Sequence, residues 1–584
     1  MLSVVAVPAG AHRIYVANDN HTDYGWNAST QTYDQSMLSE LDYYLKTNPA
    51  AQPFAADCWW YLRLYQQSRS AADFQLLIDA MKAGKITVPL NPFVTLYGAV
   101  PTEAAIRAGY YPGRMERQYG VSFLTAQEME NSTIPWGIAS IWAGSRVKYS
   151  WKGLCGCATD APYLARADEV FRWLGPDDRE LLMKWYRLTG SNASWGGYAE
   201  ARANLSSSAL DTAISQFSAP TGLPTGLFGL GWDDVGTESA NTVKTGVLGQ
   251  LVATFNASHT TDQAVFSNEV DYFQDLEASR AQLPARKGGF GNEWDLLPAT
   301  LAAPTAQTRR AVEELRTAEA LAAVAQWADP TFWSPHQQAL DAAWVDYFKY
   351  FEHTWVTGAA GSFVANKRTW AQSFADAVAA LDTAATAAVA SRFATPAGED
   401  RFAVFNPLGW ARTDVADLAV AGAGPYVVTD VATGTEVPSQ VVTLGGTRYL
   451  RILASNVPSP GYRVYRWAAG TWPRRERRDR HRERSRASYR VTLGSRGEIT
   501  SAYDKVTSRE SVRATSAFND FGGGTSSGLV VENQGPVRRR RCAAWRVRRS
   551  GPCASRSRAS IVWRSRTASR AHSAGSGSTC STLA

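Results

Sequence analysis

The chain has 584 residues, more than one hydrophobic core usually serves, so we expect several domains. Its net charge of +7 is concentrated in two arginine-rich stretches, 474–486 with +5 and 538–570 with +12, which together leave −10 for the rest of the chain. This acidic remainder shows no basic face interleaved with aromatics, so the composition predicts no nucleic-acid partner.

The first predicted strand is RIYVAND, residues 13–19, and His21 and Asp23 follow it in NDNHTDYGWNAS. Residues two apart in an extended chain point to the same side, so the imidazole and the carboxylate would meet at the strand end. Such a pair suits a metal ion. A histidine paired with an aspartate at an ordinary strand end is the alternative interpretation.

Short apolar runs alternate with amphipathic stretches over the first three hundred residues. Residues 53–65 and 85–91 predict further strands, and residues 36–46 and 71–84 predict helices. This alternation is typical of a mostly parallel sheet covered by helices. We therefore expect residues 1–303 to form an α/β, barrel-like catalytic domain whose site lies at the carboxyl ends of its strands.

The stretch GVSFLTAQ, residues 120–127, predicts a strand that runs into Glu128 and Glu130. After it, Ser132 or Thr133 would cap a helix that starts at Pro135 and ends at Gly144. Carboxylates at a strand end, directly before a helix, lie where catalytic groups gather in such folds.

Two later stretches also carry acidic and aromatic residues. LFGLGWDDVGTES places Trp232, Asp233 and Asp234 between glycines, either as a loop that faces substrate or as helix caps. GFGNEWDLLP, residues 289–298, is either a turn or a set of substrate contacts.

The composition changes after the α/β domain. Residues 304–395 are alanine-rich with apolar positions every three or four residues, which predicts a helical bundle. Within them His353 lies between aromatic helix residues and a glycine-rich turn, as a structural histidine or as a ligand. Residues 396–535 are rich in β-branched and aromatic residues between glycines and prolines, which predicts a C-terminal antiparallel β domain, sandwich-like and truncated.

Residues 473–487 interrupt the β pattern, and residues 536–584 form a basic, low-complexity tail. Both stretches are either out-of-frame translation of a GC-rich coding sequence or nucleic-acid tails. We favour the first interpretation, which predicts that the last fifty residues lack a packed domain.

The six cysteines form no dense disulfide framework, and Cys155-Gly-Cys157 is too close for a zinc knuckle. The N-terminus lacks a basic segment before a full apolar run, and no run of about 18 apolar residues occurs. We therefore expect no membrane span. The compartment, cytoplasmic or secreted with the signal missing from this chain, and the oligomeric state stay open.

In their order, these elements resemble glycoside hydrolase family 38, the α-mannosidases. The family's catalytic domain opens with a strand ending in His-x-Asp-x-Gly-Trp, and HTDYGW, residues 21–26, matches every fixed position. The resemblance extends from about residue 13 to 530, because three later features also fit the family: the Pro-initiated helix after 120–127, FNPLGW and VPSPGYRVYR.

The resemblance implies a zinc ion held by His21, Asp23, Glu130 and His353. The family has an aspartate, both ligand and nucleophile, where this chain offers only Glu128 or Glu130. We choose Glu130 because it lies closer to the helix start, where the helix dipole favours negative charge. Its extra methylene would shift either the metal or the sugar.

The resemblance also implies Glu130 as nucleophile and Asp234, ahead of Asp233, as general acid/base. A retaining enzyme needs these two carboxyls about 5–5.5 Å apart. The implied substrate contacts are Trp26, Lys152, Trp232, Asp233, Asn292, Glu293 and Trp294.

The sequence therefore predicts a zinc-dependent retaining glycoside hydrolase whose partner is a mannoside-type carbohydrate. A metal-dependent enzyme acting on a different glycan and a non-catalytic carbohydrate-binding protein are the alternatives.

Overall fold

The structure is a computed structural model. It describes residues 559–561 and residues 11–512, the latter with gaps at 21, 27, 48, 50–52, 128–133, 153–169, 186–206, 231–237, 291–293, 356–360, 445, 471–482, 486–488 and 494–498. The chain divides into two compact units, of which the first comprises Met1–Thr386 and the second begins at Ala387. The predicted division into four domains at residues 303, 395 and 535 stays a prediction.

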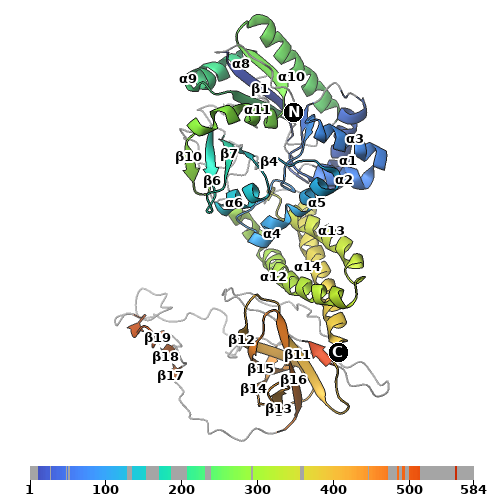
Figure 1. The fold of residues 1–584 in the computed structure, drawn as a ribbon, viewed down its shortest axis with the longest axis vertical. Helices are drawn as coiled ribbons and strands as arrows, with labels where there is room; N and C mark the ends of the chain where they lie inside the picture. The colour runs from blue at the N-terminus through green and yellow to red at the C-terminus, as the bar shows by residue number, and fades with distance from the viewer. Residues whose placement is uncertain are drawn as a thin grey trace. The chain divides into compact units, whose positions relative to one another are not determined.

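A parallel sheet around strand β1 organises the first unit (Figure 1). Its strands are β1 (Arg13–Asp19), β2 (Phe54–Ala55), β3 (Ile86–Thr87), β8 (Thr225–Leu230) and β9 (Gln263–Ser267). β1 pairs in parallel with β2, β8 and β9, and β2 pairs in parallel with β3. The predicted parallel sheet is confirmed here. Asp19 lies opposite both Ala55 and Leu230, so these strands end at one edge.

Strand β1 is buried on both faces, which explains its nearly unbroken apolar run. Ile14 and Val16 pack in a cluster with Leu248 and Phe255 of helix α10 (Glu238–Ser258). Tyr15 and Ala17 face the opposite way, into a cluster that takes in the second sheet of the unit.

The second sheet has the order β10-β6-β7-β5-β4. These strands are β4 (Thr125–Gln127), β5 (Tyr149–Lys152), β6 (Val170–Leu174), β7 (Glu180–Trp185) and β10 (Ala285–Lys287). All pairs are parallel except β6 with β7. The two sheets share no strand pairing among the described residues, and the barrel-like closure stays a prediction.

Helices connect these strands and cover them (Figure 1). They are α1 (Thr30–Asp42), η1 (Tyr43–Thr47), α2 (Trp60–Ser68), α3 (Ala71–Lys82), α4 (Thr102–Arg107), α5 (Tyr110–Tyr119), α6 (Gly137–Gly144), α8 (Ser207–Ala213), η4 (Ile214–Ser218), α9 (Ala219–Thr221), α10, α11 (Glu269–Leu276), η5 (Glu277–Gln282) and η6 (Trp294–Leu301). The predicted helices at 36–46 and 71–84 are confirmed. The helix expected from Pro135 begins two residues later, at Gly137, and ends at Gly144 as expected.

The strand predicted over residues 53–65 is wrong beyond its first residues. Only Phe54–Ala55 is extended, and the chain forms helix α2 from Trp60 onward. All six residues from Trp60 to Tyr65 are buried, and five of them are apolar or aromatic, so this part of the sequence looks like a buried strand.

Three long helices complete the first unit: α12 (Ala302–Ala328), α13 (Ser334–Tyr350) and α14 (Gly361–Ala390), of which α14 ends just beyond the boundary at Thr386. Phe374 of α14 packs against Trp344 and Tyr347 of α13. Gln307 of α12 donates a hydrogen bond to Gln372 of α14. The helical character predicted for residues 304–395 is confirmed, whereas the arrangement as a bundle stays a prediction.

The second unit is built of strands, as predicted. They are β11 (Asp400–Asn406), β12 (Arg412–Ala419), β13 (Tyr426–Asp430), β14 (Ser439–Leu444), β15 (Thr447–Val457), β16 (Gly461–Ala469), β17 (Glu483–Ser485), β18 (Tyr489–Leu493), β19 (Ile499–Asp504), β20 (Arg509–Glu510) and β21 (Ala559–Ile561). The order β13-β16-β11-β21 forms one sheet and β12-β15-β14 another, antiparallel except where β21 meets β11. Val404, Leu418 and Ile452 from the two sheets share one core, so the sheets pack face to face.

The predicted hairpin from Ser488 onward is confirmed by the antiparallel pair β18 and β19. Apart from β21, the tail at 536–584 lies outside the described residues, as do Cys155 and Cys157.

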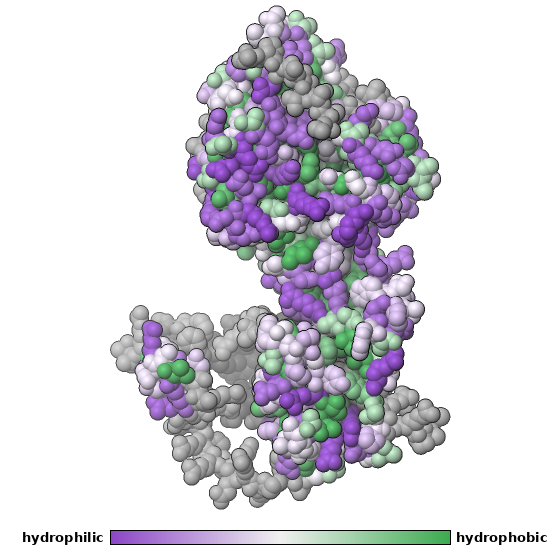
Figure 2. Space-filling view, viewed as in Figure 1, coloured by the Kyte–Doolittle hydropathy of each residue, from purple (hydrophilic) through white to green (hydrophobic). Residues whose placement is uncertain are grey.

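Two features relate to the expectation of no membrane span: the polarity of the surface and the apolar helix α14. The visible face of the first unit is largely hydrophilic, with hydrophobic residues in small separate patches (Figure 2). Among the described helices, α14 is long and apolar enough over Phe363–Ala390 to cross a membrane, judged by length and composition alone. Its buried Phe374 packs against α13, as in the core helix of a folded domain.

Candidate functional site

The chain leaves strand β1 at the edge of the sheet and is anchored there by its neighbours. The backbone N–H of Asn20 donates to the carbonyl of Ala55 at 3.2 Å. The N–H of Thr22 donates to Asp57 Oδ2 at 2.6 Å, and Asp57 is buried. The predicted metal-binding stretch therefore begins between the carboxyl ends of β1 and β2, although His21 itself lies outside the described residues.

A tight turn then presents Asp23. The N–H of Trp26 donates to the carbonyl of Asp23 at 3.0 Å, and Gly25 has φ +86°, a conformation that side chains disfavour. Tyr24 is fully buried, its ring packs against Phe93, and its hydroxyl donates to Asp34 at 2.9 Å. The glycine of the HTDYGW stretch is thus explained by the turn and the tyrosine by packing.

Asp23 meets His353, which is 330 positions later in the chain. Asp23 Oδ1 lies 2.9 Å from His353 Nε2, with side-chain exposures of 13% and 1%. Of the four predicted ligands, these are the two whose side chains the structure describes, and it brings them into contact. His21 and Glu130 lie outside the described residues.

The loop that carries His353 is fixed by its backbone and by a buried ion pair. The N–H of His353 donates to the carbonyl of Val94 at 2.9 Å. His353 Nδ1 lies 2.7 Å from Glu352 Oε1, and Glu352 Oε2 lies 3.3 Å from Lys367 Nζ. Both members of that pair are almost fully buried.

Lys367 also ties down the end of helix α13. Its ammonium donates to the carbonyls of Lys349, Tyr350 and Glu352 at 3.0, 3.1 and 2.9 Å. A cation at the last carbonyls of a helix complements the helix dipole. Lys367 therefore fixes both the helix end and the carboxylate that orients the imidazole.

The charges in this cluster support one another. Burial would raise the pKa of Glu352, but Lys367 and His353 outweigh it and hold that pKa below its ordinary value. Burial lowers the pKa of Lys367 to about 8, against the opposing effect of Glu352. Glu352 is therefore a carboxylate at neutral pH, with one oxygen 2.7 Å from His353 Nδ1.

The sequence reasoning missed Glu352 and Lys367. One signal was available for the lysine, because it shares the spacing of the buried Phe363, Ala371 and Phe374 on helix α14. A lone charge inside an apolar helical stripe needs a buried partner. Nothing in the sequence marks Glu352 apart from its position beside His353.

Trp294, predicted as a substrate contact, lies directly against this cluster. Its ring is nearly parallel to that of His353, with an interplanar angle of 8° and centroids 5.8 Å apart. Trp26 is partly buried in the turn after Asp23. Asn292 and Glu293 lie outside the described residues.

The other predicted site residues follow strand ends that the structure describes. β4 ends at Gln127, whose side-chain amide donates to the carbonyl of Ala56 at 3.3 Å, so this strand end lies beside that of β2. β8 ends at Leu230, opposite Asp19. The structure does not describe the side chains of the remaining predicted site residues, which are Glu128, Glu130, Lys152, Trp232, Asp233 and Asp234.

The donor chemistry of the described pair fits the implied zinc ion. Both ring nitrogens of His353 face carboxylate oxygens, Glu352 at Nδ1 and Asp23 at Nε2. A proton on Nδ1, which the neighbouring Glu352 carboxylate would favour, leaves Nε2 available to a cation that Asp23 also contacts, as in carboxylate–histidine–zinc arrangements. The described residues alone contain no group of three metal-ligating side chains, and two of the four predicted ligands are not among them.

The fold and the site define an α/β protein with a His–Asp pair at the carboxyl edge of a parallel sheet. No protein-family model and no curated protein matches the chain. Its structure is similar to that of an alpha-mannosidase from Enterococcus faecalis V583, with 16% identity, 85% of this chain and 61% of that chain covered, and a TM-score of 0.64. It is also similar to a protein in glycosyl hydrolase family 38 from Enterococcus faecalis, with 16% identity, 86% and 59% covered, and a TM-score of 0.59.

These likenesses confirm the predicted resemblance to glycoside hydrolase family 38 at the level of the fold. The chain spans about three fifths of the length of the two proteins.

Proposed function

We propose that the protein is a zinc-dependent retaining glycoside hydrolase that acts on α-mannosides or related glycans. The observation that carries the proposal is the contact between Asp23 and His353, two predicted ligands 330 residues apart, within a fold shared with an alpha-mannosidase. Trp294 beside this pair offers an aromatic face suited to a sugar ring.

His21, Asp23, Glu130 and His353 would hold the zinc ion. When bound, the ion supplies a Lewis acid that binds sugar hydroxyls and favours the oxocarbenium-like transition state. The carboxylate of Glu352, 2.7 Å from His353 Nδ1, would favour a proton on that nitrogen and so leave Nε2 toward Asp23.

The chemical steps fall to two carboxyl groups. Glu130 attacks the anomeric carbon and forms a glycosyl ester, while Asp234 gives its proton to the departing glycosidic oxygen. Asp234 then takes a proton from water, whose oxygen displaces Glu130 and restores the original anomeric configuration. Lys152, Asp233, Trp232, Asn292 and Glu293 would orient the sugar.

A metal-dependent enzyme for a different glycan is the second candidate. The feature that favours it is glutamate at the position of the family's aspartate, because the longer side chain changes the distance between nucleophile and sugar.

The test is hydrolysis of 4-nitrophenyl α-mannoside by the full chain and by Asp234→Asn. We expect the substitution to lower kcat at least about 100-fold, and a chelator to abolish activity that added zinc restores. Asp262→Asn is the matched control, because Asp262 also pairs with a histidine, His12, at 2.9 Å.

Three outcomes separate the candidates. Turnover of another glycoside but not of α-mannoside supports the second candidate. Zinc binding without turnover of any glycoside, by a chain with a cooperative thermal transition, contradicts both enzyme proposals and favours a carbohydrate-binding protein. Full activity of Asp234→Asn contradicts its role as general acid.

A further inference from the structure

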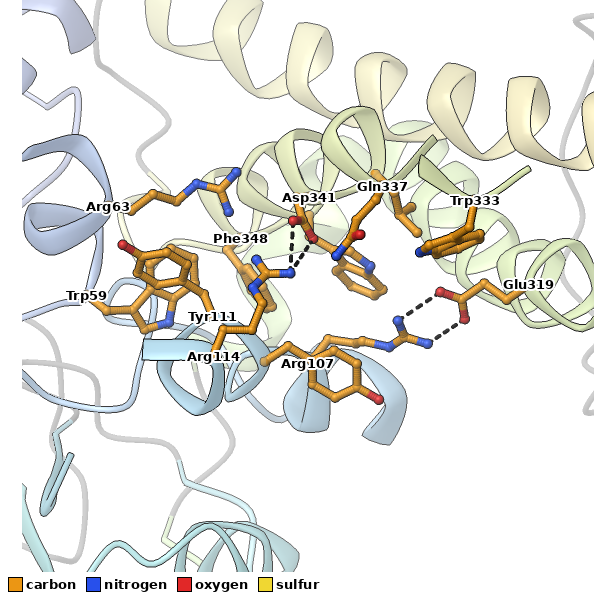
Figure 3. A pocket seen from close by; sticks show the side chains of 13 residues that line it. Trp59, Arg63, Arg107, Tyr111, Arg114, Glu319, Trp333, Gln337, Asp341 and Phe348 are labelled. Atoms are coloured by element: carbon orange, nitrogen blue, oxygen red, sulfur yellow. Dashed lines mark hydrogen bonds and ion pairs between the residues drawn. The ribbon is translucent and has the colours of Figure 1, made fainter. Parts of the chain in front are cut away.

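A pocket lies between helices α2, α4 and α5 on one side and α12 and α13 on the other (Figure 3). Its volume is about 190 Å³, which is room for a molecule of roughly monosaccharide size. None of its lining residues is a predicted site residue of the glycosidase. The lining is Trp59, Arg63, Arg107, Tyr110, Tyr111 and Arg114 from the first side, with Glu319, Trp333, Gln337, Leu340, Asp341, Trp344 and Phe348 from the second.

Two of the three arginines in the pocket are already neutralised by carboxylates. Arg107 forms a two-pronged ion pair with Glu319, with one prong at 2.8 Å. Arg114 lies 2.9 and 3.1 Å from the two carboxylate oxygens of Asp341. Figure 3 shows both pairs across the pocket, between the two groups of helices.

Arg63 is different, because its guanidinium has no hydrogen bond and no ion pair within the described part of the chain. The residue is 8% exposed, its guanidinium lies 5.5 Å from the centroid of the Tyr111 ring, and Asp341 is a nearby carboxylate that acts on its charge. Burial lowers the pKa of Arg63. A guanidinium carries five N–H donors, and leaving them unpaired in a buried place is unfavourable.

The other charges around the pocket are paired. Arg107 has two carboxylates, Glu319 and, at 2.8 Å, Glu103, while Arg114 has Asp341, so Arg63 is the arginine of the lining without an ion pair in the described part of the chain. Figure 3 shows the Arg63 side chain extending toward the side of the pocket where Asp341 lies. The Arg63 guanidinium therefore borders the cavity, where an incoming anion could reach it.

The walls around Arg63 are aromatic. Trp59 packs on Tyr111 with centroids 5.0 Å apart, and Trp344 packs on Phe348 at 5.7 Å. Tyr110 is half exposed at the rim. Flat apolar faces beside one fixed cation suit a ligand that combines a ring with a single oxyanion.

We propose that this pocket binds a monosaccharide-sized molecule carrying a carboxylate or phosphate group, with Arg63 as the residue that receives the oxyanion. The guanidinium fork matches both oxyanions in two-pronged geometry. The proposal does not rest on the glycosidase function, since the pocket and the predicted site share no residue.

Calorimetric titration of the full chain at constant ionic strength tests the proposal. The compounds are inorganic phosphate, glucose 6-phosphate, glucuronate and, as the neutral control, glucose. We expect glucose 6-phosphate or glucuronate to bind at least about 10-fold more tightly than glucose. The phosphate and glucuronate arms decide which oxyanion the pocket prefers.

Arg63→Met removes the guanidinium that would bind the oxyanion, and we expect it to weaken binding of the charged compounds about 10-fold or more. Its melting temperature without ligand should be unchanged or higher, because a buried unpaired charge has been removed. Arg179→Met is the matched control, since Arg179 is an exposed arginine of the same unit, with 63% side-chain exposure. It should bind as the wild type does.

Asp341→Asn gives an independent test in case Arg63→Met does not fold. It removes a competing carboxylate and releases Arg114, so anion binding should become about 5-fold tighter or more. The proposal is overturned if no charged compound binds better than glucose, if Arg63→Met binds them as tightly as the wild type, or if Asp341→Asn gains no affinity.

Discussion

Glu269 is a buried carboxyl group with too few partners. It is the first residue of α11 and is 2% exposed. The hydroxyl of Thr87 donates to Oε1 at 2.9 Å, whereas Oε2 has no hydrogen-bond partner among the described residues. Burial raises the pKa of Glu269 to about 7, and the bond from Thr87 offsets only part of that effect.

This shift predicts a pH dependence of stability. Because the folded pKa of about 7 is above the ordinary 4.5, the folded state keeps a proton that the unfolded chain releases between these values. The contribution to stability is full below about pH 4.5 and is lost as the pH rises through 7, by up to about 3 kcal/mol. Glu269→Gln should remove this loss and be more stable than the wild type at about pH 8.

Urea unfolding of both proteins at about pH 5 and about pH 8 measures the difference. Glu116→Gln, in the partly exposed helix α5, is the matched control and should keep the pH dependence of the wild type. Equal pH dependence in the wild type and in Glu269→Gln would show that the carboxyl group titrates as it does in water.

At the scale of elements, the connection from α13 to α14 holds the candidate site together. It carries Glu352 and His353, and Lys367 of α14 reaches back to the last carbonyls of α13 and to Glu352. The position of the His353 imidazole therefore depends on helices α13 and α14, which are linked through the buried ammonium of Lys367. We expect this buried ion pair to specify the geometry of the site more than it stabilises the fold.

Lys367→Met should destabilise the protein by about 3–5 kcal/mol, because Glu352 would remain as a buried carboxylate without its cation. The double substitution Lys367→Met with Glu352→Leu should recover most of that loss in urea unfolding, yet should not restore zinc binding. Lys287→Met, at an exposed lysine, should change stability by less than about 0.5 kcal/mol.

A double variant as unstable as Lys367→Met alone would contradict this account. The carbonyl bonds of the lysine would then matter more than its pairing with Glu352.

The elements differ in how much the sequence reveals of them. Strand β1 and helix α3 were predictable, since one is an apolar run before a polar loop and the other has a Ser70 cap and an amphipathic face. Helix α2 was not, because its first six residues are all buried and all but Arg63 are apolar or aromatic, as in a buried strand. The turn at Asp23 was predictable as a motif, but the support given by Glu352 and Lys367 depends on a tertiary contact that no local pattern encodes.

At the scale of the whole molecule, the candidate site depends on chain segments that meet only after the first unit has folded. Asp23 follows the first strand, and His353 follows α13. The order of the motifs, through the family resemblance, predicted the contact between Asp23 and His353. The spacing of these two residues along the chain could not predict it. All four predicted ligands lie within Met1–Thr386, so zinc should act on the first unit alone.

Zinc binding should therefore stabilise one unit selectively. At free zinc about 100-fold above its Kd, the unfolding free energy of the first unit should rise by about 2.7 kcal/mol, because the unfolded chain does not hold the ligands together. Scanning calorimetry of the full chain should show that transition moving upward with zinc while the transition of the second unit stays in place. Asp23→Asn should lose most of the shift.

Asp262→Asn is the control that makes this result specific. His12 and Asp262 form a second pair with the same 2.9 Å separation, just before β1 rather than after it. If zinc bound to any histidine–carboxylate pair, both substitutions would reduce the shift, and a shift that Asp23→Asn leaves intact would contradict the proposed centre. Because β1 separates the two pairs, a loss confined to Asp23→Asn would locate the ion at the carboxyl edge of the sheet, where the proposed chemistry requires it.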